Sequence, residues 1–234
     1  MSHYAVAVFH REDQNVDEML APFDENISVA PYIAFTKKEA IEYGKKNFSD
    51  DFLKGKTNQE IWEGVAEYYD DCTDADGNIY TTYNPQSKWD WYEEGGRYCN
   101  LLKLKNGKTA DSARVSDIDF SDDEKAYRDA LRFWDVVVDG APAEEGEDYF
   151  SIYNPEYYKK YYGDRESYAK ACAQWSTFAV LTPDGVWHEP GKMGWWGMSN
   201  ESPEDSKDWH ANYHERFIAA ADPNWNLTIV DCHI

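Results

Sequence analysis

A short segment, residues 84–97, combines three aromatic rings, two cations and adjacent glycines in the string N-P-Q-S-K-W-D-W-Y-E-E-G-G-R. Gly95 and Gly96 permit positive φ, and successive N–H groups in such a turn can form a nest that binds an anion. Arg97 can hold a phosphate or carboxylate through two hydrogen bonds, while Lys88 adds a point charge. A ring could also stack on the tryptophans. We therefore predict that a small, ring-bearing anion contacts Lys88, Trp89, Asp90, Trp91, Tyr92, Gly95, Gly96 and Arg97.

A second segment, residues 190–200, repeats this chemistry in the string P-G-K-M-G-W-W-G-M-S-N. Each segment follows an Asp-Gly dipeptide and then offers a proline, a lysine and two tryptophans. Two equivalent loops would line one pocket. The second loop adds these residues to the predicted contacts: Lys192, Trp195, Trp196, Ser199 and Asn200.

The same residues also have a purely structural interpretation, which stays open. The rings of Trp89, Trp91 and Tyr92 would then be core, and the glycine pair would be a hairpin turn. Lys88 and Arg97 would form salt bridges with neighbouring carboxylates. If the pocket instead performs a reaction, Asp90 would be the base, because its tryptophan neighbours give a local reason for a perturbed pKa.

Metal and cofactor motifs are weak in this chain. His210 and His214 have the i, i+4 spacing of a metal-binding helix, but no glutamate follows the first histidine. The four cysteines are far apart and include no C-x-x-C pair, so we expect reduced thiols. No nucleotide-hydrolysing P-loop, Rossmann fingerprint or G-x-S-x-G motif is present. We predict neither a metal nor a cofactor.

Composition excludes several classes of protein. Lys and Arg number 23 against 45 Asp and Glu, a formal net charge of −22, so long nucleic acids are repelled and non-specific binding to them is not expected. A hydrophobic fraction of 42% excludes a disordered acidic tail. The sequence shows neither a signal peptide nor a stretch of about 18 apolar residues. We expect a cytoplasmic protein without membrane contact, and the aromatic content makes self-association into a homo-oligomer plausible.

Strand and helix signals alternate along the chain. Residues 3–9 and 227–234 have the composition of β-strands, and Asp76-Gly77 and Asp184-Gly185 are typical of hairpin turns. The spacing S/T-x-x-E predicts capping boxes, and Asn-Pro or Ser-Pro predicts a cap followed by the first helical residue. These signals predict helices that start after residues 36, 57, 121, 154 and 202, and a further helix is predicted after residue 164.

These elements predict an α+β fold in a single domain, residues 1–234. A mainly antiparallel sheet would contain both terminal strands, with about six helices packed on it. In the last helix Trp209, Tyr213, Phe217 and Ala220 form an apolar stripe, which we assign to the core. The acidic run 141–148 is rich in helix-breaking residues and is predicted to be a flexible surface loop, the only candidate linker.

The string N-P-x-S-K-W-D-W-Y-x-x-G-G-R, with L-A-P-F-D-E-N-I at residues 20–27 and G-W-W-G at 194–197, resembles a family of uncharacterised phage and prophage proteins. The resemblance runs over most of the chain. That family has no assigned activity, so no catalytic residue is carried over. The resemblance implies a role in the conflict between phage and host, in the host cytoplasm, and proteins that sequester nucleotide immune signals are the analogue.

Three functional hypotheses follow. In the first, the protein is a non-catalytic sponge of phage origin that sequesters a nucleotide-derived signal of host defence in the tryptophan-rich pocket. In the second, it is an acidic inhibitor that imitates DNA and binds a basic host defence protein. In the third, it is a hydrolase or transferase that processes a nucleotide in the same pocket.

Overall fold

The computed structural model describes residues 2–69, 72–194 and 198–234. The chain divides into two compact units, one made of Met1–Phe23 and Lys88–Ile234 and the other of Asp24–Ser87. In the sequence, the second unit is therefore an insertion between the two segments that form the first unit. The acidic run 141–148 lies inside the first unit and is mostly exposed, as a surface loop would be.

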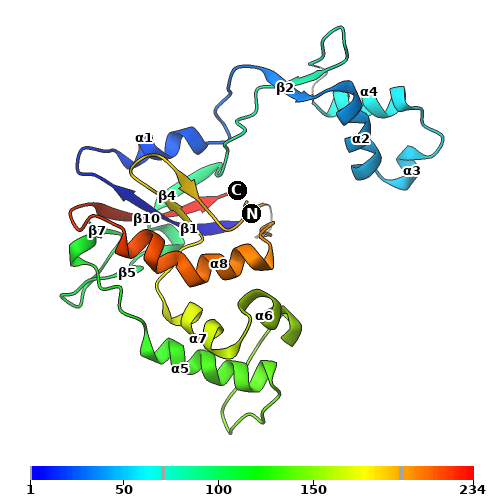
Figure 1. The fold of residues 1–234 in the computed structure, drawn as a ribbon. Coiled ribbons are helices and arrows are strands. Elements are labelled where there is room, and N and C mark those ends of the chain that lie inside the picture. The colour runs from blue at the N-terminus through cyan, green and yellow to red at the C-terminus, as the bar shows by residue number, and fades with distance from the viewer. Residues whose placement is uncertain (1, 70–71, 195–197) are drawn as a thin grey trace. The chain divides into compact units, whose positions relative to one another are not determined.

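A sheet in the first unit contains both ends of the chain (Figure 1). Its two long strands pair antiparallel from His3–His233 to His10–Asn226, and the next neighbour of β1, β8, runs parallel to it. The strand order is β4-β10-β1-β8-β9, and β7 also pairs with β10. The strands are β1 (His3–His10), β4 (Trp91–Glu94), β7 (Ser112–Arg114), β8 (Ala179–Leu181), β9 (Trp187–His188) and β10 (Asn226–His233).

Both faces of the sheet are buried at its central strands β1 and β10, since successive residues of β1 enter different cores. Tyr4, Val6 and Val8 belong to one cluster, which α1 (Val16–Leu20) covers with Leu20. Ala7 and Phe9 belong to the other, which α8 (Pro203–Tyr213) covers with Trp209 and Tyr213. Burial on both sides explains why the terminal strands are runs of apolar residues rather than strictly alternating ones.

Further helices pack beyond α8 (Figure 1). Around Trp134 and Tyr158 they form a separate aromatic cluster. They are α5 (Glu124–Phe133), α6 (Pro155–Tyr162) and α7 (Arg165–Ala173), with π turns η4 (Trp134–Val138) after α5 and η6 (His214–Ala219) after α8. Short elements complete this unit: η1 (Ala21–Phe23), η2 (Gly96–Tyr98), β5 (Leu102–Lys103), β6 (Thr109–Ala110) and η3 (Val115–Asp117).

The second unit has its own small core of Ala40, Val65, Ala66 and Ile79. Its two strands pair antiparallel, and Thr36 and Thr57 form the predicted capping boxes. The elements are β2 (Tyr32–Phe35), α2 (Lys37–Asn47), α3 (Asp50–Leu53), α4 (Asn58–Tyr68) and β3 (Ile79–Thr81).

Most helix starts agree with the sequence, but the capping box at Ser121 is wrong. Helix α5 begins at Glu124, and its cap is Asp123, whose carboxylate accepts hydrogen bonds from the N–H groups of Lys125 and Ala126. The N–H of Ser121 donates to Asp119 instead. A carboxylate is a strong acceptor at a helix N-terminus, so the cap lies two residues later.

The α+β prediction with both terminal strands in one mainly antiparallel sheet is confirmed. The turn at Asp184-Gly185 joins β8 to β9 as an antiparallel hairpin. Of the apolar stripe in the last helix, Trp209, Tyr213 and Phe217 are buried, whereas Ala220 is exposed. The described residues include no helix long and apolar enough to cross a bilayer. The single domain over residues 1–234 stays a prediction.

His210 on α8 makes stability depend on pH. Its ring stacks on Tyr162 at 5.3 Å between centroids, and burial lowers the pKa of the imidazole. The unfolded state takes up this proton near the ordinary pKa of about 6.5, before the folded state does, so this histidine lowers stability as pH falls below that value.

We therefore predict that His210→Gln flattens the fall in unfolding free energy between pH 7 and pH 5. Chemical denaturation of both proteins at several pH values measures this slope. His214→Gln, at an exposed position one turn further along, is the matched control and should keep the wild-type slope. A slope that is identical in His210→Gln and wild type would contradict the assignment.

Candidate functional site

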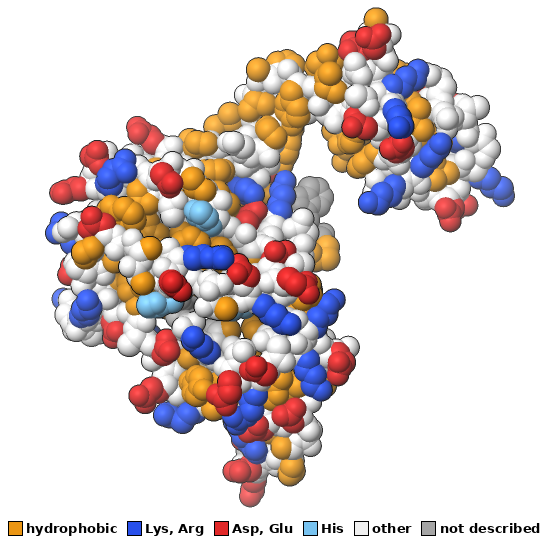
Figure 2. All heavy atoms as spheres, viewed as in Figure 1, with side chains coloured by type: hydrophobic (Ala, Val, Ile, Leu, Met, Phe, Trp, Pro, Cys, Tyr) orange, Lys and Arg blue, Asp and Glu red, His pale blue; other side chains and the backbone are white. Residues whose placement is uncertain are grey.

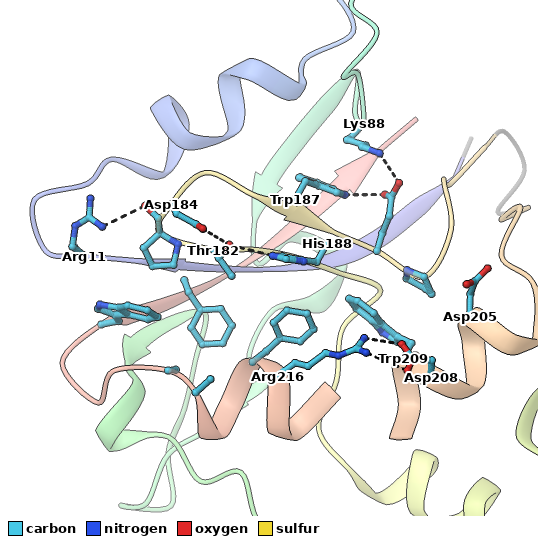
Figure 3. Close-up of a pocket in the computed structure, with 18 residues that line it drawn as sticks. Arg11, Lys88, Thr182, Asp184, Trp187, His188, Asp205, Asp208, Trp209 and Arg216 are labelled. Atoms are coloured by element: carbon cyan, nitrogen blue, oxygen red, sulfur yellow. Dashed lines mark hydrogen bonds and ion pairs between the residues drawn. The ribbon is translucent and has the colours of Figure 1, made fainter. Parts of the chain in front are cut away.

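A cavity of about 880 Å³ opens between the β8–β9 hairpin and α8 with its π turn (Figure 3). We call it the hairpin cavity. The hairpin is held by hydrogen bonds from the N–H of Thr182 to Val186 O and from the N–H of Gly185 to Thr182 O. Gly185 has φ +81°, which explains the glycine in this turn. The cavity has the size of a small-molecule site.

Aromatic side chains form much of its wall. They come from both sides of the opening and from the strand beneath it, and the set is Phe9, Trp187, His188, Trp209, Phe217 and Trp225. His188 packs on Phe217 at 5.2 Å between centroids, and burial lowers the pKa of its imidazole. At neutral pH this ring is therefore uncharged and offers a flat face rather than a cation.

Charged groups of both signs line the same cavity. Lys88 Nζ lies 2.5 Å from Glu189 Oε1, while the indole N–H of Trp187 donates to Glu189 Oε2 at 2.8 Å. Arg216 Nη1 lies 2.7 Å from Asp208 Oδ2, and hydrogen bonding to this arginine lowers the pKa of the aspartate (Figure 3). A bound anion must therefore compete with these carboxylates.

Of the three cations that line the hairpin cavity, Arg11 has the weakest interactions with other residues. Half of its side chain is exposed, its Nε lies 3.5 Å from Asp13, and Nη1 donates to Pro183 O at 3.4 Å. Asp184 lines the cavity nearby, and a hydrogen bond from Thr182 lowers the pKa of that carboxyl.

Figure 2 shows basic and acidic side chains interspersed on the visible face of the first unit.

Of residues 84–97, Lys88 is the predicted contact that lines this cavity. Trp89 lies in the core, as the structural interpretation of the segment allowed. Its side chain is buried, and its indole N–H donates to Leu20 O at 3.3 Å. A ligand cannot stack on a ring enclosed in this way.

The next three predicted residues lie on or beside β4. Trp91 is 49% exposed, and the hydroxyl of Tyr92 donates to Asp17. Asp90 Oδ1 lies 2.6 Å from Nδ1 of His233. The structure places Asp90 against a histidine of β10, and Asp90 does not line the hairpin cavity.

Gly95 and Gly96 have positive φ as predicted, but the protein supplies the anion itself. The N–H of Arg97 donates to Asp231 Oδ2 at 3.0 Å, and Asp231 is almost fully buried. Asp111 accepts a hydrogen bond from the N–H of Asn100 in the same turn. The Arg97 side chain is exposed and lies away from the hairpin cavity.

The second predicted segment folds back on itself. The N–H of Lys192 donates to Asn200 Oδ1 at 2.7 Å, and Met193 bridges Ser199. Lys192 and Asn200 are exposed, whereas Ser199 lines another cavity of about 540 Å³, here called the terminal cavity. Trp195 and Trp196 lie outside the described residues.

The two segments meet the hairpin cavity at one predicted contact residue and at one residue that was not predicted. Lys88 comes from the first, and Pro190 comes from the start of the second. Sequence reasoning missed most of the wall, because Arg11, Trp225 and Arg216 are far apart in the chain and none stands in a motif. The Asp184-Gly185 turn signal gave the hairpin itself.

Sequence reasoning also missed a cluster at the chain ends, in which His3 pairs with Asp231 and His233 pairs with Asp90. The two terminal strands were the available signal, because each carries a histidine near its end. Among the described residues, no group of three or more His, Cys, Asp or Glu side chains could hold a metal.

Comparisons with family models, curated proteins and solved structures found no match. The resemblance of residues 84–97 to phage proteins therefore stays a prediction, and so do the partners and the location in the cell.

A substitution in the glycine pair tests whether the turn needs glycine to accommodate the Asp231 side chain. A Cβ on Gly96 would lie 2.5 Å from Asp231 Cβ, and the φ of +48° is itself unfavourable for other residues. Gly96→Ala should lower the unfolding free energy by roughly 2–4 kcal/mol, from strain plus steric displacement. Gly107→Ala is the control, because Gly107 also has positive φ but faces open space. Equal losses in chemical denaturation would contradict this account.

Proposed function

We propose that the protein binds a small, ring-bearing anion of the nucleotide class in the hairpin cavity and holds it without converting it. The observation that carries this proposal is the combination, in one cavity of about 880 Å³, of half-buried rings with three cations. Those cations, Arg11, Lys88 and Arg216, come from three separate parts of the chain. The same wall also holds four carboxylates, those of Asp184, Glu189, Asp205 and Asp208, so a phosphate would be held by individual cations rather than by a positive cavity.

Each class of lining residue matches one part of a nucleotide. Trp225 and the uncharged ring of His188 offer faces for a base, and stacking contributes about 1–3 kcal/mol per base. The guanidinium of Arg11 suits a phosphate, because its planar donors match the geometry of the oxygens. Carboxylates such as Asp184 accept hydrogen bonds from sugar hydroxyls or from an exocyclic amino group.

A bound phosphate must compete with the ion pairs that two of these cations already form. Arg216 and Lys88 each hold a carboxylate, so phosphate must displace Asp208 or Glu189 from its partner. Exposed pairs such as Arg216–Asp208 are weak and exchange at little cost, whereas the less exposed Lys88–Glu189 pair is harder to open. Arg11 has the most freedom to make the first contact.

This proposal shifts the site from the tryptophan-rich segment to the hairpin. Lys88 belongs to both versions, whereas Arg97 belongs to the predicted site alone. The resemblance to phage proteins favours a nucleotide signal of bacterial defence as the ligand, which would make the protein a sponge. The net charge of −22 favours the acidic-inhibitor hypothesis, and the described residues add no specific observation for it or for the nucleotide-processing hypothesis.

We expect a panel of mono-, di- and cyclic nucleotides to contain a ligand that raises the melting temperature of the wild type. Arg11→Ala should weaken its binding about 10- to 100-fold, the effect of losing a hydrogen bond to a charged group. Arg97→Ala removes a charge that is also exposed but lies outside the cavity, and this variant should bind as the wild type does. Thermal shift, calorimetry and native mass spectrometry measure these differences.

Three results would contradict the proposal. Loss of binding in Arg97→Ala but not Arg11→Ala would place the ligand at the predicted segment. A ligand whose mass changes during long incubation with substoichiometric protein would indicate an enzyme. If no nucleotide stabilises the wild type, the hairpin cavity is not a nucleotide site. The corresponding nucleosides, which lack phosphate, should bind more weakly than the nucleotides.

A further inference from the structure

His3 and His233 face each other across the two terminal strands. They are direct partners in the antiparallel register, and Ser2 and Ile234 beside them exchange two backbone hydrogen bonds of 3.1 Å. His3 and His233 are therefore a pair without mutual backbone hydrogen bonds, the kind in which opposite side chains lie closest. Their ring centroids are 4.9 Å apart, with the planes inclined at 72°.

A separate carboxylate orients each ring. Nδ1 of His3 lies 3.0 Å from Asp231 Oδ1, and Nδ1 of His233 lies 2.6 Å from Asp90 Oδ1. An ionised carboxylate can only accept a hydrogen bond, so Nδ1 carries the proton in both rings. In the neutral imidazole the lone pair is then on Nε2.

We propose that this pair binds one divalent transition-metal ion of the Zn²⁺ type through the two Nε2 atoms. Two imidazoles on one tetrahedral ion, with metal–nitrogen distances of about 2.0–2.1 Å, have centroids about 5 Å apart, close to the observed spacing. Two protein ligands leave the remaining positions to water or to a small molecule.

Each ring of the pair has a carboxylate on Nδ1, the nitrogen opposite the proposed metal ligand. A carboxylate on the second ring nitrogen is the usual outer partner of a metal-bound histidine, because it fixes the tautomer and makes the ligand more basic. Asp231 is 1% exposed and is held in addition by the N–H of Arg97. Trp91 packs edge-on against both rings, at 6.3 and 6.4 Å between centroids.

Access and selectivity follow from the same geometry. His3 lines the terminal cavity of about 540 Å³, and 14% of its side chain is exposed. Imidazole ligands suit Zn²⁺, Cu²⁺ and Ni²⁺, whereas Mg²⁺ and Ca²⁺ require oxygen ligands. The site is distinct from the hairpin cavity, so its presence does not depend on the proposed nucleotide binding.

The test is isothermal titration of the full chain, freed of metal with a chelator, with Zn²⁺. The double variant His3→Gln/His233→Gln should lose binding by at least 10-fold. Asp90→Asn and Asp231→Asn keep both ligands and should bind about 10- to 100-fold more weakly, the effect of removing an outer-shell carboxylate. Circular dichroism establishes that each variant is folded, and the Asp90→Asn result stands if the double variant is not.

The control is His214→Gln, which removes an exposed histidine outside the terminal cavity and should bind Zn²⁺ as the wild type does. The Co²⁺-loaded protein should show d–d absorption without a thiolate charge-transfer band, which excludes the four cysteines. The proposal is overturned if wild type binds no Zn²⁺, if the His3/His233 double variant binds it equally well, or if the Co²⁺ spectrum shows thiolate ligation.

Discussion

The antiparallel pairing of β1 with β10 is the constraint on which the first unit depends. It joins the two ends of the chain in the centre of one sheet, with β8 on one side and β4 on the other. Most of the residues in these two strands are buried, so the pairing also carries the largest share of the core on both faces. The hairpin cavity, the glycine turn and the histidine pair are all positioned by this sheet.

A chain with a net charge of −22 must place many carboxylates, and this one uses several as internal partners. Asp231 is buried against His3 and the N–H of Arg97, so the glycine turn binds an anion that belongs to the protein. Glu189 likewise holds Lys88 at the hairpin cavity. Some of the N–H groups and cations that would attract a free anion in an isolated peptide are therefore already bound to carboxylates of the folded protein.

The two cavities differ in the chemistry of their walls. The hairpin cavity combines stacking faces with cations and carboxylates, which suits a ligand with a ring, a phosphate and hydroxyl groups. The terminal cavity adjoins a histidine whose tautomer is fixed by Asp231, which suits coordination. The two cavities share Pro190 and Trp209, but neither His3 nor His233 lines the hairpin cavity.

The sequence by itself determined the local structure. The caps at Thr36, Thr57, Asn154 and Ser202, the Asp184-Gly185 hairpin and the two terminal strands follow from chemistry within a few neighbouring residues. Only the tertiary structure decided which side chains meet, because contacts between residues such as His3 and Asp231 depend on how the strands pair. For the same reason Trp89, which lies just before β4, became part of the core cluster with Leu20, whereas Trp91, on the edge strand β4, stayed 49% exposed.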